Sequence, residues 1–151
     1  MRIKRILVLT VCMMLSFGSF AVFANDGGNS LVKVCSNGEF VSFNENNLPF
    51  ISENRVMMPV RKICEALNAS VVWESETQTV FISKNNTSLA FQAGATTMFK
   101  SENSQSSLIE TETAAVLKDD TLTAPVRFIA EALGASVSWD NNQMTVIITY
   151  E

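Results

Sequence analysis

Arginine and glutamate stand four residues apart at two places in the sequence, Arg61 with Glu65 and Arg127 with Glu131. On a helix this spacing puts both side chains on one face, so the carboxylate could hold a ligand-binding arginine in place. The alternative is an ion pair within the helix, which contributes only roughly a few tenths of a kcal/mol when it is exposed. Because both residues recur at the second place, a structural role is favoured.

The two tryptophans, Trp73 and Trp139, are the next candidates for chemistry. Indole faces suit carbohydrate rings, so both residues are candidate sugar-stacking platforms. Each tryptophan also follows a valine at strand spacing, Val71 or Val137, which is the pattern of an inward strand face. The spacing therefore favours a core position for both tryptophans.

Acid–base catalysis by paired carboxylates is the remaining possibility. Glu110 and Glu112 would share one face of a predicted strand, but such catalysis needs two carboxylates in different environments within a cleft. Nothing in the pattern indicates a cleft. The chain contains no histidine, which excludes Ser-His-Asp and Cys-His arrangements. We therefore expect no enzyme, no cofactor and no metal site, with a carboxylate-pair hydrolase as the least favoured hypothesis.

The arginine–glutamate pairs and the two tryptophans lie in an internal repeat. Residues 55–82 and 121–148 align without a gap at an offset of 66 residues, and 14 of the 28 positions are identical. Chance does not give this agreement, so the two stretches are copies of one repeat. The positions expected to define its structural motif are Pro59, Arg61, Glu65, Leu67, Trp73, Pro125, Arg127, Glu131, Leu133, Gly134 and Trp139.

Each copy of the repeat predicts a short helix. Proline suits the first helical turn, so the helices should begin at Pro59 and Pro125. Apolar residues then recur at i, i+3, i+4 and i+7, which indicates one stripe facing a core. The helices should stop at Asn68 and Gly134, the residue types that best tolerate the left-handed conformation at a helix C-terminus.

Strands account for most of the remaining sequence. After each helix the apolar period changes to two, which predicts a β-hairpin. Asn37-Gly38 predicts another tight hairpin, whereas residues 101–107 are polar and predict a mobile loop. The sum is about ten short strands and two short helices, an α+β fold of mostly antiparallel sheet built from two tandem strand–helix–hairpin repeats.

The first 24 residues have the composition of a signal peptide, with a positive start, an apolar run and small residues before Asn25. An uncleaved membrane anchor is the alternative, since the apolar run is almost long enough to span a bilayer. Residues 25–30 then form a flexible leader and residues 31–151 one domain, with repeat 1 at 31–85 and repeat 2 at 86–151. No later run is apolar enough to predict a transmembrane segment after signal cleavage.

Charge narrows the choice of partner. The formal net charge is −4, and it becomes −7 when residues 1–24, with three positive charges and no negative ones, are removed. Nucleic acid and anionic lipid both need a basic face, so neither is an expected partner.

Two cysteines follow the predicted signal peptide, Cys35 and Cys64. In an exported protein they are candidates for a disulfide. The alternative for Cys64 is a small apolar core residue, because Ala130 takes its place in the second copy.

A family resemblance rests on the second copy, where Ala124-Pro125-Val126-Arg127 through Ile148 is similar to the signature of the copper amine oxidase N-terminal-like domain, also called the stalk domain. The first copy departs from that signature at Lys62, Cys64 and Asn68. The resemblance covers about residues 31–150, essentially the whole chain after the signal peptide. It implies antiparallel sheet wrapped around the helices.

The resemblance also implies a module without oxidase activity. In the amine oxidases that activity lies in a different, larger domain, which needs three histidine copper ligands and a tyrosine-derived quinone. This chain has no histidine, and its single tyrosine, Tyr150, is the penultimate residue. Copper chemistry is therefore not expected.

The sequence as a whole predicts a non-catalytic bacterial module that is secreted or associated with the cell surface. Its expected partner is an extracellular or cell-envelope protein, or a second copy of itself. The alternative is a cell-wall polysaccharide, bound by exposed aromatic residues such as Phe99, Phe128 or the two tryptophans.

Overall fold

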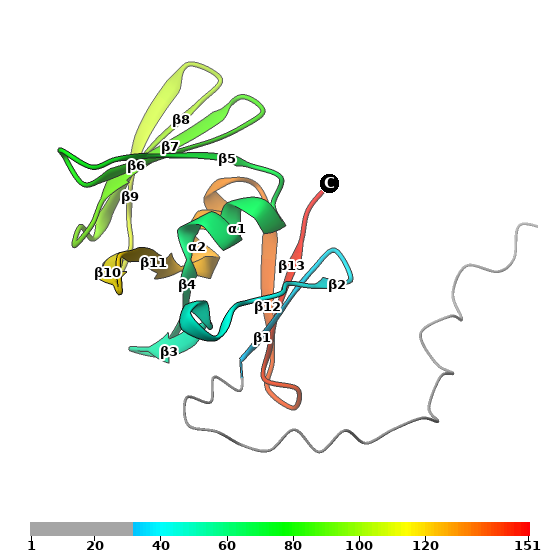
Figure 1. Ribbon diagram of the computed structural model, residues 1–151. Coiled ribbons are helices and arrows are strands. Elements are labelled where there is room, and N and C mark those ends of the chain that lie inside the picture. Colours follow the sequence, from blue (N-terminus) through cyan, green and yellow to red (C-terminus); the bar gives the residue numbers. More distant parts are fainter. Residues whose placement is uncertain (1–31) are drawn as a thin grey trace, which may run out of the picture.

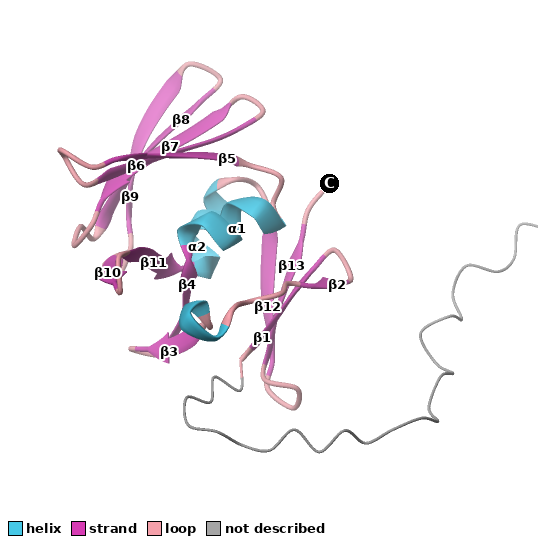
Figure 2. Cartoon of the chain, in the orientation of Figure 1, coloured by secondary structure: helices cyan, strands magenta, loops and turns pink. Residues whose placement is uncertain are grey.

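The computed structural model describes residues 32–151. The predicted signal peptide and leader lie outside the described residues. Two helices occupy the centre, with sheets arranged around them (Figure 1), and strands make up most of the remaining chain (Figure 2). The prediction of an α+β fold with mostly antiparallel sheet is confirmed, although the described part has thirteen strands rather than about ten.

The strands form three sheets, named here the terminal, central and five-stranded sheets. The terminal sheet has the order β12 (Ser136–Asp140), β13 (Thr145–Thr149), β1 (Lys33–Ser36) and β2 (Glu39–Phe40). The central sheet has the order β10 (Val116–Lys118), β11 (Thr121–Pro125), β4 (Arg55–Pro59) and β3 (Phe50–Ser52). The five-stranded sheet has the order β5 (Ser70–Glu74), β6 (Thr79–Lys84), β7 (Thr87–Gln92), β8 (Thr97–Glu102) and β9 (Gln105–Glu110). The helices are α1 (Val60–Ala66), α2 (Val126–Ala132) and a single 3-10 turn, η1 (Glu45–Asn47).

Both α-helices bury the predicted apolar stripes. They begin one residue later than predicted, because Pro59 and Pro125 are extended and end the preceding strands, with ψ angles of 128° and 119°. The buried stripe residues are Val60, Ile63, Cys64, Leu67, Val126, Ile129, Ala130 and Leu133. All of them belong to one hydrophobic cluster, so the two halves of the chain share a single core.

The helix ends follow the prediction closely. Asn68 and Gly134 both have positive φ, at 54° and 88°. After α1, the backbone N–H of Ala69 donates to the Cys64 carbonyl at 2.8 Å and that of Asn68 donates to the Glu65 carbonyl at 3.3 Å. This pair of bonds is the Schellman motif, and the same pair closes α2. Two unlike residues thus end the helices in the same way.

The strands that lead into the two helices, β4 and β11, pair antiparallel in the central sheet. Met58 lies opposite Ala124, its own counterpart at the offset of 66 residues. After each helix an antiparallel pair follows, β5 with β6 and β12 with β13. The same order of elements therefore occurs at both stretches that share the sequence motif.

The terminal sheet joins the two ends of the domain. β1 runs parallel to β13, with Val34 opposite Val146. The predicted hairpin at Asn37-Gly38 connects β1 to β2, and both turn residues have positive φ. The side chain of Asn37 also exchanges two hydrogen bonds with the backbone of Tyr150, at 2.9 and 3.0 Å. The first and last strands thus hold each other in place.

The prediction of a mobile loop at residues 101–107 is wrong. This stretch forms the end of β8 and the start of β9, joined by a turn in which Asn103 and Ser104 have φ angles of 48° and 66°. The strands are polar here because the tip of this hairpin is exposed on both faces. A pattern of buried alternate residues is therefore missing although the strands are paired.

Candidate functional site

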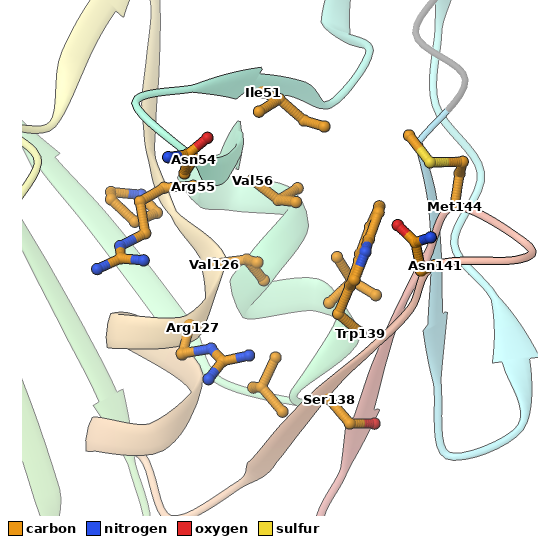
Figure 3. Close-up of a pocket in the computed structure, with 13 residues that line it drawn as sticks. Ile51, Asn54, Arg55, Val56, Val126, Arg127, Ser138, Trp139, Asn141 and Met144 are labelled. Carbon is orange, nitrogen blue, oxygen red and sulfur yellow. The ribbon is translucent and has the colours of Figure 1, made fainter.

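The first candidate site is a cleft of about 410 Å³ that we call the Trp139 cleft. It lies between α2, the β12–β13 pair and the β3–β4 hairpin. Trp139 stands at its centre, with Val126 of α2 on one side and Met144 on the other, and Arg127 extends from α2 toward β12 (Figure 3). The cleft combines an aromatic ring, an aliphatic wall and a guanidinium.

A second cleft, the Trp73 cleft, has a volume of about 490 Å³. It lies between α1, the β5–β6 pair and the β10–β11 hairpin. Its lining includes Val60, Arg61, Val71 and Trp73, the counterparts of residues in the Trp139 cleft. It repeats the combination of indole, aliphatic wall and guanidinium.

The two clefts correspond almost residue by residue. Twelve of the thirteen residues that line the Trp139 cleft have a counterpart, 66 positions away, that lines the Trp73 cleft. Each cleft is completed by the hairpin that precedes the other helix, since β3–β4 precedes α1 and β10–β11 precedes α2. The pairing of β4 with β11 brings each hairpin to the opposite helix.

The core position predicted for the tryptophans is wrong for Trp73 and only partly right for Trp139. Trp73 is 36% exposed, while Trp139 is half-buried and packs against the core. The alternation correctly places Val71 and Trp73 on one side of β5, but that side opens into a cleft beside α1. Strand period determines which side a residue faces, and not what covers that side.

The predicted ion pairs of Arg61 with Glu65 and of Arg127 with Glu131 are not formed. Glu65 instead accepts a hydrogen bond from Lys62 Nζ at 2.9 Å. Arg61 and Arg127 are exposed, and neither makes an ion pair within residues 32–151. Both guanidinium groups therefore keep their donors available at the clefts.

Arg55 makes the long-range ion pair that the sequence did not indicate. Its guanidinium donates to Glu112 Oε2 and lies 5.8 Å from the centre of the Phe128 ring. Glu112 follows the end of β9, so it does not share a strand face with Glu110 as predicted. The candidate carboxylate pair is thus divided between a strand end and an ion pair.

The two cysteines are both free thiols, so the candidate disulfide is not formed. Ser36 of β1 faces α1, because its Oγ donates to the Ala66 carbonyl at 2.7 Å. Cys35, the preceding residue, must then point to the opposite side of the sheet, away from Cys64. Cys64 is fully buried in the core, and this burial raises the pKa of its thiol to about 12, against the opposing effect of the positive Arg61.

An exposed apolar row crosses the outer face of the five-stranded sheet, and sequence analysis missed all of it except Phe99. The strand register places its members side by side, Val72 opposite Phe81, Phe81 opposite Ala90, Ala90 opposite Phe99 and Phe99 opposite Leu108. Four of them are large and strongly exposed, at 62% for Val72, 49% for Phe81, 44% for Phe99 and 72% for Leu108. Each appears in its own strand as a single outward apolar residue, so only the register shows that they form one row.

Among residues 32–151, no three cysteine, aspartate or glutamate side chains are grouped so as to hold a metal ion. Within the same residues, no helix is both long and apolar enough to cross a bilayer.

Comparison with known proteins assigns the family. The profile of the copper amine oxidase N-terminal domain matches residues 35–148, which is most of the chain. This is a non-catalytic domain of those enzymes. No curated protein matches the sequence. The chain therefore belongs to the copper amine oxidase N-terminal domain family.

Proposed function

We propose that this protein is an exported, non-catalytic interaction module that acts at the bacterial cell surface or outside the cell and binds protein, in the first place a second copy of itself. The observation that carries the proposal is the apolar row formed by Val72, Phe81, Ala90, Phe99 and Leu108. Soluble proteins rarely leave such contiguous apolar surface without a partner.

The sequence of sizes along the row favours self-association. Ala90 forms a notch between Phe81 and Phe99, and the two ends of the row are similar aliphatic residues. A two-fold axis parallel to the strands and through Ala90 would place Phe81 of one copy opposite Phe99 of the other. Since neighbouring strands are about 4.8 Å apart, the row is about 19 Å long. A contact surface that repeats itself in this way is what a symmetric dimer needs.

The tandem-repeat interpretation belongs to the same proposal. It is supported by the pairing of Met58 with Ala124 and by the corresponding residues of the two clefts. A local two-fold axis through the β4–β11 pair would relate the two units. In this arrangement each unit contributes a hairpin to the other, so neither has a complete core alone.

Export rests on the composition of residues 1–24. N-terminal sequencing of the protein recovered from cell-free medium or from the cell surface should begin at Asn25. A cytoplasmic location, with Met1 still present, would contradict this part of the proposal and leave the dimer proposal standing.

Sedimentation velocity at about 1 to 200 μM protein tests self-association. A dissociation constant of 1 μM, at the lower end of this range, corresponds to a binding free energy of about 8 kcal/mol in magnitude. The expected result is a monomer–dimer equilibrium that shifts to monomer in the double variant Phe81→Ser/Phe99→Ser. Thr97→Ser, a change on the same face of β8 outside the row, is the matched control and should leave the equilibrium unchanged. A monomer throughout the range, or equal dimerisation of all variants, would exclude the row as a dimer surface.

A further inference from the structure

We propose that the Trp139 cleft binds a sugar residue that carries a carboxylate, as a uronic acid does, with the ring stacked on Trp139 and the carboxylate held by Arg127. The site uses none of the residues of the apolar row, so it does not depend on the dimer proposed above.

The charge of the cleft is the first argument. The residues that line it include two arginines, Arg55 and Arg127, and no aspartate or glutamate. The chain as a whole, in contrast, has a net charge of −4. Arg55 is engaged by Glu112 and Phe128, whereas Arg127 is exposed and makes no ion pair within the described residues. Arg127 is therefore the cation that remains available for an anionic ligand.

The shape of the cleft is the second argument. Its volume of about 410 Å³ lies within the range of small-ligand sites. Trp139 offers a flat ring between Val126 and Met144, with the amide of Asn141 beside it, and the amide of Asn54 lines the β3–β4 end of the cleft (Figure 3). A sugar ring has an apolar face for the indole and hydroxyl groups at its edge for the polar side chains. A guanidinium matches a carboxylate with two parallel hydrogen bonds.

The Trp73 cleft provides a comparison within the same molecule. It keeps the tryptophan and the arginine, but Asp120 replaces Asn54 and Thr121 replaces Arg55. Its additional cation, Lys62, is already paired with Glu65. The carboxylate of Asp120 repels an anionic ligand and weakens binding there. We therefore expect the Trp139 cleft to bind the acidic sugar more tightly than the Trp73 cleft.

Nuclear magnetic resonance of the full chain tests the proposal directly. The chain has two tryptophans, so it gives two indole N–H signals, one for each cleft, which Trp73→Phe and Trp139→Phe assign. The probes are a β-1,4-linked glucuronic acid oligomer and a β-1,4-linked glucose oligomer of equal length. The Trp139 signal should shift to saturation when the acidic oligomer is added. The dissociation constant for the neutral oligomer, read from the same signal, should be at least about tenfold higher, as expected for loss of one charge-assisted interaction.

Two arginine variants give the decisive comparison. Arg127→Gln should weaken binding of the acidic oligomer at the Trp139 signal by at least about tenfold. Arg61→Gln is the matched control in the other cleft and should leave that signal's titration unchanged. Since Arg127 is exposed and unpaired in the described structure, the dispersion of the amide spectrum should stay native in both variants. Equal shifts with both oligomers, no shift with either, or equal weakening by both variants would overturn the proposal.

Discussion

Trp73 and Trp139 occupy the same position in the two copies of the sequence motif, yet their surroundings differ. Trp73 is 36% exposed on an open cleft, while Trp139 is half-buried against the core. The Trp139→Phe variant, which retains Trp73, should therefore be quenched by iodide more steeply than the Trp73→Phe variant. Because iodide is an anion and each cleft contains an arginine, neutral acrylamide must give the same order. The reverse order with both quenchers would contradict the greater solvent exposure of the Trp73 side chain.

Cys64 gives a second prediction at the residue scale. Burial raises the pKa of its thiol to about 12, whereas the unfolded thiol titrates near 8.5. Below that lower pKa both states hold the proton and the thiol contributes no pH dependence. Above it the unfolded state releases a proton that the folded state keeps, so the free energy of unfolding falls by up to about 1.4 kcal/mol per pH unit. Urea unfolding from pH 7 to 10 should show this loss.

The matched variant is Cys64→Ala, because Ala130 fills the corresponding position. It should unfold with a shallower dependence on pH above about 8.5 than the parent protein. Equal slopes would mean that the thiol titrates alike in both states.

In the folded protein, alkylation at pH 8 followed by peptide mapping should modify Cys35 well before Cys64.

At the scale of the element, the hairpin of β8 and β9 shows where local pattern fails. Residues 101–107 lack the alternation that identifies a half-buried strand, yet they pair through Lys100 with Ser107 and Glu102 with Gln105. The information for this pairing lies in the turn, where both Asn103 and Ser104 have positive φ. A type I′ turn prefers Asn followed by Gly. Because Ser104 stands where glycine is preferred, the sequence does not show the usual hairpin pattern.

The turn makes a prediction of its own. Ser104→Gly should raise the free energy of unfolding by about 0.5 kcal/mol, because glycine relieves the positive φ but loses more entropy on folding. Thermal or urea unfolding measures the difference, with Ser104→Ala as the control that keeps the strain and should give no gain. A loss of stability in Ser104→Gly would mean that the hairpin has another turn type.

The helix ends show the opposite case, in which local sequence was sufficient. Asn68 and Gly134 were predicted as C-terminal residues from their tolerance of positive φ alone, and both helices close with the same hydrogen bonds. Such signals work because all partners lie within a few residues. The predicted Arg–Glu pairs also involve residues close in sequence, but exposed charged side chains can choose among several partners. Glu65 pairs with Lys62 instead of Arg61.

At the scale of the whole molecule, the features that could not be predicted are those that depend on strand register. The apolar row exists only because five strands align Phe81, Ala90 and Phe99 with their neighbours. The clefts exist only because the β4–β11 pair carries each hairpin to the opposite helix. Spacing along the chain identified the helices, the hairpins after them and the motif residues, but it cannot specify which distant strands meet.

The shared core leads to a final prediction. Since α1 and α2 lie in one hydrophobic cluster and each half supplies a hairpin to the other, residues 32–151 should unfold in one cooperative step. The single-tryptophan variants Trp73→Phe and Trp139→Phe report on different halves. In each of them, fluorescence and far-ultraviolet circular dichroism should give the same urea midpoint.

Met58→Ala sharpens this test, because Met58 is fully buried in the β4–β11 pair between the two halves. Removing a side chain of this size from a core costs about 2 to 5 kcal/mol. Combined with either tryptophan variant, it should lower the midpoint seen by fluorescence and by circular dichroism together. If only the Trp73 signal moved, or if the two probes separated, the halves would unfold independently, and the exchange of hairpins would contribute little to their stability.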